Sequence, residues 1–284
     1  MHLAKSLPAP RGAAIALVAL GLSASIGLSS ASAADKPVTP NADAELIQRL
    51  EASGALDQAV DRAIERRIRR DAEQRQKAAL DQQAKRAALA ANARAPDPKR
   101  DHIYGAAKTP YSVIVYSDLE CPFCKRFAGI AEKAAATVGE KVNVVWRHYP
   151  LDFHGKVAVQ EAVAAECVTQ QAGDKGFFKF VDAVLAATQT NGKGLPGGDA
   201  ALSAMAKQAG ASDDKLLKVC LADTAVETRV QDDMQDGIKA GIEGTPGLIL
   251  RDNLSGRAQM VGGALTQEQM DRALRTFIEM KQGG

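Results

Sequence analysis

Two hydrophobic patterns divide the first third of the chain. Residues 12–28 are almost continuously apolar, whereas the segment between Pro40 and Pro96 is polar and carries a single narrow apolar stripe. That segment has no internal proline, contains one glycine, Gly54, and is dominated by helix-favouring residues. The pattern predicts one long helix whose stripe consists of Leu46, Leu50, Val60, Ile64 and Ile68.

The stripe of this helix is too narrow to be the core of a domain and fades into alanines after Ile68. A narrow apolar seam is what a partner helix covers, so we expect residues 34–98 to form a helical stalk that joins protomers into a homo-oligomer. The alternative is that the stripe packs back onto the rest of the chain. Pro96 and Pro98 end the segment and mark a domain boundary.

Beyond this boundary the pattern changes from helical to mixed. Residues 111–116 and 142–146 are rich in β-branched and aromatic side chains, which predicts two buried strands, and residues 122–138 between them have helical spacing. Several apolar stripes at helical spacing follow over about 156–240. The chain closes with a strand at 248–250, a turn at 253–256, a short strand near Met260 and a helix that Thr266 and Gln269 open as a capping box.

Composition narrows the class of function. The 36 basic residues nearly balance the 34 acidic ones and aromatic residues make up only 4%, so neither a strong positive field nor a stacking surface for nucleic acid is present. The arginines of the long helix alternate with acidic residues, which is typical of a solvated, ion-paired face. We therefore expect no nucleic-acid partner.

The N-terminus has the order of regions of a secretory signal peptide. Lys5 and Arg11 precede the apolar run, and Ala31-Ser32-Ala33 follows it, which predicts cleavage after Ala33. The alternative is an uncleaved membrane anchor, because the apolar run approaches spanning length. Export would place the mature chain in the bacterial periplasm, where disulfides form, so the four cysteines are interpreted first as redox or structural residues.

The chemistry-bearing motif is Cys121-Pro122-Phe123-Cys124, at the junction of the first predicted strand and its helix. Backbone N–H groups at a helix start stabilise a thiolate on the first cysteine, and Pro122 suits the first turn because it has no N–H to satisfy. The second cysteine lies one turn later, where it can attack a mixed disulfide. Cys121 is the expected attacking thiol and Cys124 the resolving one.

Other uses of the cysteines are weaker interpretations. A zinc site needs two further soft ligands, and the remaining cysteines and histidines show no paired spacing, so we expect no metal. The two thiolates could instead hold Cu(I) in a copper-binding or chaperone protein. Cys167 and Cys220 lie in the same helical region and are predicted to form a structural disulfide, with two buried free thiols as the alternative.

A second signal is Gly244-Thr245-Pro246, immediately before the strand at 248–250. A proline that enters a strand shortly after a glycine suggests a special backbone conformation such as a cis peptide bond. Asp118 and Glu120 stand beside the cysteines, where they could relay a proton or simply form a solvated strand end.

Through these motifs, residues 101–282 resemble the DsbA-like family of thioredoxin-fold enzymes, in the branch that includes the suppressor-of-copper-sensitivity type proteins. The resemblance rests on the strand leading into Cys-Pro-Phe-Cys, on Tyr149-Pro150-Leu151 and on Gly244-Thr245-Pro246. It implies an α/β thioredoxin fold with an inserted helical domain, Pro246 as a cis-proline facing the cysteines, and Thr245 as a backbone partner for substrate peptides. Phe123 stands where a histidine is common in the oxidases, which puts strong oxidising power in doubt.

These expectations combine into one hypothesis: a signal peptide at 1–33, a stalk and linker at 34–98, and a DsbA-like domain at 99–284 with its insertion at about 156–240. The chain would exchange disulfides in unfolded or misfolded exported proteins, need no bound cofactor and be reset by a membrane redox partner. A shared space between several Cys121 sites would favour a disulfide isomerase. The alternatives are a dithiol oxidase of the DsbA type and the copper(I)-binding protein.

Overall fold

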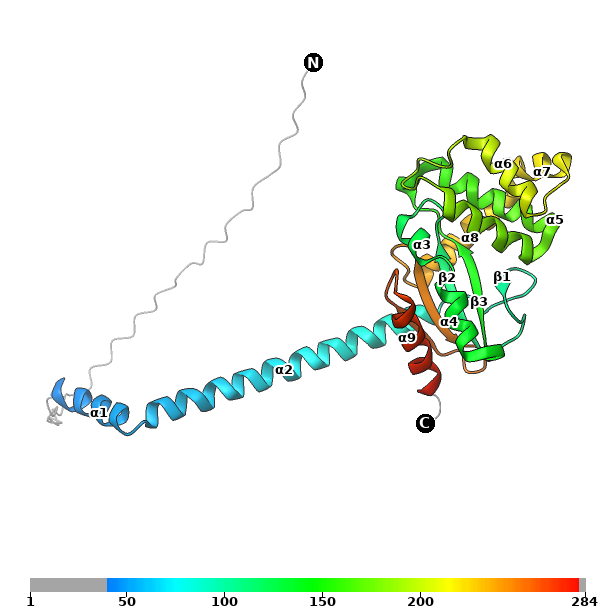
Figure 1. Cartoon of the computed structure of the whole chain (residues 1–284). Coiled ribbons are helices and arrows are strands. Elements are labelled where there is room, and N and C mark those ends of the chain that lie inside the picture. Colours follow the sequence, from blue (N-terminus) through cyan, green and yellow to red (C-terminus); the bar gives the residue numbers. More distant parts are fainter. Residues whose placement is uncertain (1–39, 281–284) are drawn as a thin grey trace, which may run out of the picture. The chain divides into compact units, whose positions relative to one another are not determined.

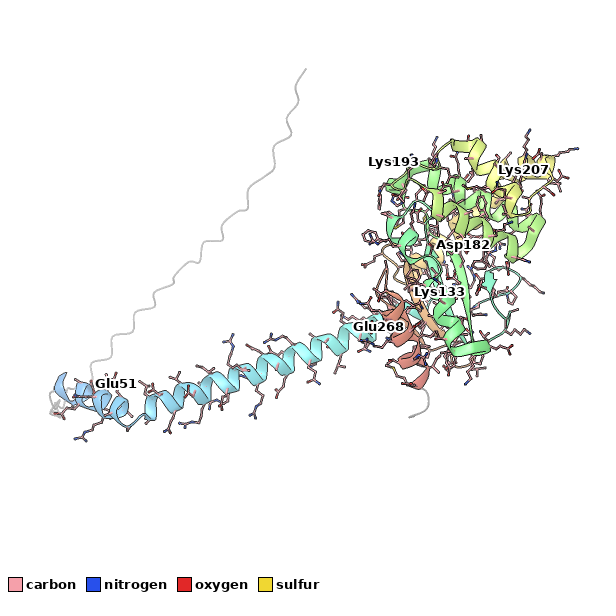
Figure 2. The ribbon with its side chains drawn as sticks, viewed as in Figure 1. Glu51, Lys133, Asp182, Lys193, Lys207 and Glu268 are labelled. Atoms are coloured by element: carbon pink, nitrogen blue, oxygen red, sulfur yellow. A yellow bond between two sulfur atoms is a disulfide. The ribbon has the colours of Figure 1, made fainter. Side chains whose placement is uncertain are left out.

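The computed structural model describes residues 40–280, so the predicted signal peptide lies outside the described residues (Figure 1). The chain divides into two units between Arg67 and Ile68. The first holds α1 (Pro40–Ala52) and the start of α2 (Ala55–Ala90). The single helix expected before Pro96 is therefore two helices, because Gly54 adopts a positive φ of 66° that breaks the helical hydrogen-bond ladder. Side chains project from all sides of α2 (Figure 2).

The second unit contains a mixed sheet of five strands within the described residues, in the order β1-β3-β2-β4-β5. The strands are β1 (His102–Tyr104), β2 (Tyr111–Ser117), β3 (Val142–His148), β4 (Gly247–Asp252) and β5 (Ala258–Val261). β2 runs parallel to β3, and Val113 pairs with both Val144 and Leu250. The expected strands are present, and β1 is an additional one that pairs antiparallel with β3.

Helices cover both faces of the sheet. Successive side chains of a strand point to opposite faces, so Val113 and Val115 pack against α4 (Ile130–Val138) and α9 (Gln267–Glu279). Ile114 and Tyr116 face the other side, where α8 (Thr224–Lys239) packs on β2 and β3. The helix expected over 122–138 is divided into α3 (Pro122–Phe127) and α4, because Gly129 adopts a left-handed conformation. The predicted capping box of Thr266 and Gln269 opens α9.

The remaining helices form the insertion, which Figure 1 shows gathered beside the end of β2 where α3 begins. They are α5 (Gly155–Ala187), with a kink at Gly173, α6 (Gly198–Ala209) and α7 (Asp214–Leu221), preceded by the short 3-10 turn Asp152–His154. A second 3-10 turn, Gly139–Lys141, leads into β3. The insertion has its own apolar core, to which Leu119, Cys121 and Cys124 also belong. α8 packs on both layers: Val226 and Val230 belong to the core of the insertion, and the helix also contacts β2 and β3.

A buried ion-pair network joins the linker after α2 to the sheet. The guanidinium of Arg147 on β3 is fully buried; its Nε donates to Asp101 at 3.0 Å and its Nη1 to Asp236 of α8 at 2.7 Å. Tyr116 Oη also donates to Asp236, at 2.5 Å, and Arg94 pairs with Asp101. Both carboxylates are thus satisfied, as buried charges must be. The architecture confirms the expected thioredoxin fold with a helical insertion.

Candidate active site

The two cysteines of the Cys-Pro-Phe-Cys motif lie where β2 passes into α3. Cys121 is the residue before the helix and has extended backbone angles, and Pro122 occupies the first helical turn. The Cys121 carbonyl accepts the Lys125 N–H at 3.0 Å, which closes that turn. Cys121 is 3% exposed and Cys124 2% exposed, and both carry free thiols.

The structure brings the second sequence motif against the first. The Thr245–Pro246 peptide bond is cis, and the Cys121 thiol donates to the Thr245 carbonyl with a sulfur-to-oxygen distance of 3.4 Å. Thr245 is 124 residues downstream of Cys121 and is placed there because β4 pairs with β2. The Thr245 hydroxyl is buried and has no hydrogen-bond partner in the described part of the chain.

This geometry gives the two thiols opposite acidities. The hydrogen bond from the Cys124 thiol is the largest cause that lowers the pKa of Cys121. Together with the neighbouring Thr245 side chain and the backbone N–H groups of Cys124 and Phe123, it outweighs burial and lowers this pKa to about 6. Burial, followed by the neighbouring Cys121, raises the pKa of Cys124 well above its usual range. At neutral pH the site therefore favours a thiolate on Cys121 and a protonated thiol on Cys124. The first is suited to attack, and the second can react only after it loses its proton.

Phe123 lies on the outer rim of the site. Its side chain is half exposed, and the Arg126 guanidinium lies 4.5 Å from its ring centroid. A cation at this distance from an aromatic face is attracted to the ring. Phe123 thus presents an apolar surface with an adjacent positive charge near the Cys121 sulfur.

Asp118 and Glu120, expected as a possible solvated strand end, are instead buried beneath the insertion. Asp118 accepts the Glu120 and Leu151 N–H groups at 2.8 Å and pairs with His154 Nδ1 at 2.6 Å. The groups that bury these two carboxylates come from residues 151–194. The sequence around Asp118 and Glu120 therefore could not predict that they are buried.

Glu161 of α5 completes an acidic cluster that sequence reasoning missed. Burial, then the neighbouring charges of Glu120 and Asp118, raise the pKa of Glu161 to about 8. At neutral pH Glu161 is thus protonated and shares a hydrogen bond with Glu120, which also accepts the Thr188 hydroxyl and the Gly194 N–H. The two acids inside the otherwise mostly apolar stretch 158–168, Glu161 and Glu166, were the signal that could have revealed it.

The other two cysteines lie in the insertion. Cys167 of α5 and Cys220 of α7 form a disulfide with an S–S distance of 2.02 Å. Both are buried in the core of the insertion, and the bond links two of its helices.

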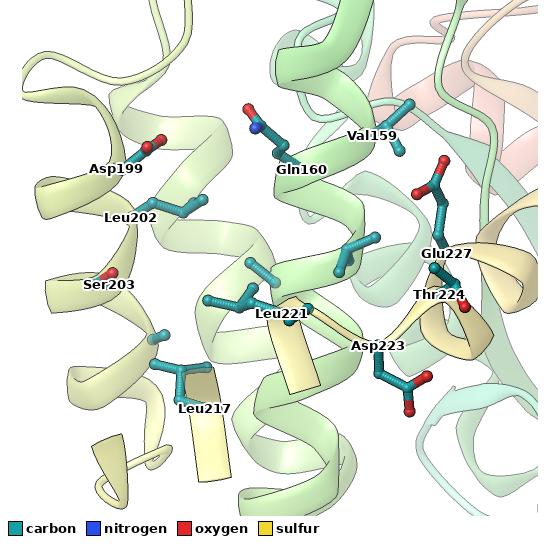
Figure 3. A pocket seen from close by; sticks show the side chains of 14 residues that line it. Val159, Gln160, Asp199, Leu202, Ser203, Leu217, Leu221, Asp223, Thr224 and Glu227 are labelled. Atoms are coloured by element: carbon teal, nitrogen blue, oxygen red, sulfur yellow. The ribbon is translucent and has the colours of Figure 1, made fainter. Parts of the chain in front are cut away.

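The insertion also contains a cavity of about 400 Å³ between α5, α6, α7 and the start of α8 (Figure 3). Leu202, Leu217 and Leu221 line it, together with acidic side chains that include Asp199 and Glu227. None of the residues that line it belongs to the cysteine site.

A buried polar cluster connects β1 and β3 with the insertion. His102 Nε2 lies 2.9 Å from Glu166 Oε1, His148 Nε2 lies 3.5 Å from the same oxygen, and Arg229 Nε pairs with Glu166 Oε2 at 2.6 Å. Their spacing in the sequence gave no indication of this cluster. Three potential metal-ligand atoms meet here, but the Arg229 guanidinium already neutralises the carboxylate, so the arrangement is that of a structural ion-pair cluster.

Comparison with known proteins agrees with this geometry. A family model described as Thioredoxin matches residues 97–276, which is more than half of the chain. The crystal structure of DsbA2 from Pseudomonas aeruginosa is 33% identical, superposes with a TM-score of 0.53, and is matched over 62% of this chain and 94% of that chain.

Two further solved structures share the fold. BcfH from Salmonella enterica Typhimurium superposes with a TM-score of 0.62 at 17% identity, over 83% of this chain and 98% of that chain. The catalytic domain of Proteus mirabilis ScsC superposes with a TM-score of 0.53 at 21% identity, over 69% of this chain and 98% of that chain.

Curated relatives match over a small part only. A stretch of 75 residues, 26% of this chain, is 39% identical to the Na(+)/H(+) antiporter NhaA 1 of Mycolicibacterium gilvum. The chain spans 12% of the length of that relative, so the match gives no information on transport. Between residues 40 and 280, no helix has the length and apolar character needed to cross a membrane.

The matched family model, the DsbA2 likeness and the thioredoxin fold together identify the reaction class. The chain belongs to the thioredoxin family and is a DsbA-like thiol-disulfide oxidoreductase.

Proposed function

We propose that this oxidoreductase acts in the periplasm on exported proteins, that Cys121 and Cys124 are its redox pair, and that it serves chiefly as a disulfide isomerase. The observation that carries the assignment of the redox pair is the low pKa of the Cys121 thiol. This thiol lies against Thr245 and beside a protonated Cys124. This pairing supplies a nucleophile at neutral pH together with a latent resolving thiol.

In isomerisation, the Cys121 thiolate attacks one sulfur of an incorrect substrate disulfide. A Cys121–substrate disulfide forms, and the other substrate sulfur leaves as a thiolate. A second substrate thiolate then attacks the substrate sulfur of the mixed disulfide and releases the Cys121 thiolate. No electrons are gained or lost overall.

When rearrangement stalls, Cys124 gives up its proton and attacks the Cys121 sulfur. The substrate leaves reduced, and a Cys121–Cys124 disulfide remains, so two electrons have passed to the substrate. A membrane redox partner must then supply two electrons to regenerate the dithiol.

The preference for isomerisation depends on assembly through residues 34–98. The apolar stripe of α1 and α2 is exposed in the single chain, with Leu46, Ile64 and Ile68 between 50% and 62% exposed. Second copies of the same helices would remove this surface from water. Several Cys121 sites could then act in turn on one misfolded substrate.

The second candidate is a dithiol oxidase, which the thiol acidity itself favours. Stabilising the thiolate stabilises the reduced enzyme and makes the disulfide a stronger oxidant. The Cys121 pKa of about 6 lies between the values of about 7 for thioredoxin and about 3.5 for DsbA. The pair is therefore expected to have an intermediate reduction potential.

Three measurements on the chain lacking residues 1–33 test the proposal. Cys124→Ser should trap substrates as mixed disulfides, whereas Cys121→Ser should trap none. Full multi-turnover reduction of insulin disulfides by Cys124→Ser would refute the assigned roles. Refolding of scrambled ribonuclease should exceed oxidation of reduced ribonuclease, and the reverse order favours the oxidase. Inactivity in controlled redox buffers, with stoichiometric Cu(I) uptake, would favour the copper-binding alternative.

Light scattering tests the assembly. The chain lacking residues 1–33 should be an oligomer, and a chain that starts at Pro98 should be a monomer. A monomeric longer chain, or an oligomer that survives truncation, would remove the reason to prefer isomerase to oxidase.

A further inference from the structure

A groove of about 730 Å³ opens beside the cis-proline loop. It is lined by Phe123, by residues 241–248 including Thr245 and Pro246, and by residues 260–264 after β5. Its remaining wall is the last part of α2, which contributes Gln82, Lys85, Arg86 and Leu89. The groove starts at the residue whose carbonyl contacts the Cys121 sulfur.

The end of α2 is fixed to the catalytic unit. Ala90 is fully buried, and a Cβ at Gly241 would lie 3.1 Å from Leu89, so helix and loop are in close contact. Just after the helix, Asn92 Nδ2 donates to the Lys239 carbonyl at 3.2 Å. Gln82, Arg86 and Leu89 recur at helical spacing, so this anchored end presents one face to the groove.

The groove combines an apolar floor with a positive wall. Leu248 is buried at the floor and Met260 and Val261 are partly buried beside it. Lys85 and Arg86 are exposed, and across residues 40–280 neither has a carboxylate within ion-pair distance. Arg126 adds a third cation over Phe123, whereas Glu243 is the one carboxylate in the lining.

We propose that the end of α2 is a substrate-selecting wall of the active-site groove, where Lys85 and Arg86 recognise an extended peptide that carries carboxylates a few residues from its reactive cysteine. The ladder of β4 begins at Gly247, so Thr245 lies just before it, where an extended peptide can lie against the backbone. An apolar residue of the peptide occupies the floor, and its acidic residues face α2. This inference rests on the proposed function, because it names the substrate class of the same Cys121 site.

The test measures how fast the oxidised chain lacking residues 1–33 oxidises dithiol peptides in a single turnover. Two synthetic peptides of identical length carry two cysteines and one leucine, flanked by glutamates in one and by lysines in the other. The quantity compared is the rate ratio of the acidic to the basic peptide, because the intrinsic thiol reactivity of each peptide cancels when ratios from different variants are compared.

The matched variants reverse two adjacent cations at two places on α2. Lys85→Glu with Arg86→Glu alters the wall, and Arg69→Glu with Arg70→Glu makes the same change in net charge about 24 Å earlier on the helix. The wall variant should lower the ratio roughly tenfold at low ionic strength, and added salt should reduce the difference. The variant with Arg69→Glu and Arg70→Glu should have the same rate ratio as the native chain.

A ratio near that of the native chain in the wall variant, or an equal fall in the distant pair, would overturn the inference. Thermal unfolding verifies that the wall variant is folded, and Lys85→Gln with Arg86→Gln should give a smaller fall in the same direction if the reversal impairs folding. Reaction of the native oxidised chain with neutral dithiothreitol distinguishes failure of this inference from failure of the proposed function. A chain that reacts with dithiothreitol but shows no peptide preference refutes only the selecting wall. A chain that does not react refutes the proposed function.

Discussion

Replacing Cys124 by alanine tests what makes Cys121 acidic. The site lowers the Cys121 pKa from 9.0 to about 6, and the largest cause is the hydrogen bond from the Cys124 thiol. At about 1.4 kcal/mol per pH unit, the environment favours the thiolate by about 4 kcal/mol. Because Cys121 is only 3% exposed, solvent screens this effect little.

A hydrogen bond to a charged group contributes about 1.5–3 kcal/mol, which equals about 1–2 pH units. Cys124→Ala should therefore raise the Cys121 pKa to about 7–8. Cys124→Ser retains an O–H donor at the same position and should keep the pKa within about one pH unit of the native value. The backbone N–H groups and Thr245 remain in both variants and account for the rest of the lowering.

The rate of iodoacetamide alkylation as a function of pH measures the change. In both variants Cys121 is the one free thiol, because Cys167 and Cys220 are joined. The native protein, digested and analysed by mass, gives the reference midpoint for Cys121. A midpoint that stays near pH 6 in Cys124→Ala would refute the assignment and leave the helix start and Thr245 as the dominant causes.

Three stability predictions follow from the buried contacts. Cys220→Ala frees a loop of 53 residues and should lower the free energy of unfolding by about 2–4 kcal/mol in urea titrations; an unchanged midpoint would show that the disulfide with Cys167 contributes no stability. Arg147→Met leaves the buried Asp236 without a cation and Asp101 with Arg94 alone. It should lower the free energy of unfolding by about 3–5 kcal/mol, which a loss below about 1 kcal/mol would contradict. Burial lowers the pKa of His102, but hydrogen bonds with Asp174 and Glu166 outweigh it and raise this pKa above 6.5. The free energy of unfolding of the native chain should therefore exceed that of His102→Gln by its full margin below pH 6.5, and the margin should shrink as pH rises through the raised pKa. Urea midpoints from pH 5 to 9 test this, and a constant difference would refute it.

Local sequence was sufficient for the elements that carry the chemistry. β-Branched residues predicted β2 and β3, and the Cys-Pro-Phe-Cys motif at the end of β2 indicated where a helix begins, because both signals are contained in a few adjacent residues. The capping box at Thr266 predicted the start of α9 for the same reason.

Elements without a strong local pattern were missed. β1 is only three residues long and exists because it pairs with β3. A segment this short shows no hydrophobic periodicity from which a strand could be predicted. The breaks at Gly54 and Gly129 depend on glycine adopting a positive φ, whereas glycine is also tolerated inside helices. Composition therefore predicted helix correctly on both sides of each break and missed the break itself.

The chemistry of the site was decided by tertiary structure. The sequence indicated Cys121, Cys124 and the Thr245-Pro246 motif as candidates, but only the pairing of β4 with β2 brings Thr245 to the Cys121 sulfur. Likewise, Glu120 is buried because α5 and the loop after it cover the end of β2. Secondary-structure signals are determined by neighbours in the chain, whereas burial and pKa depend on groups that are distant in sequence and meet only when the chain is folded.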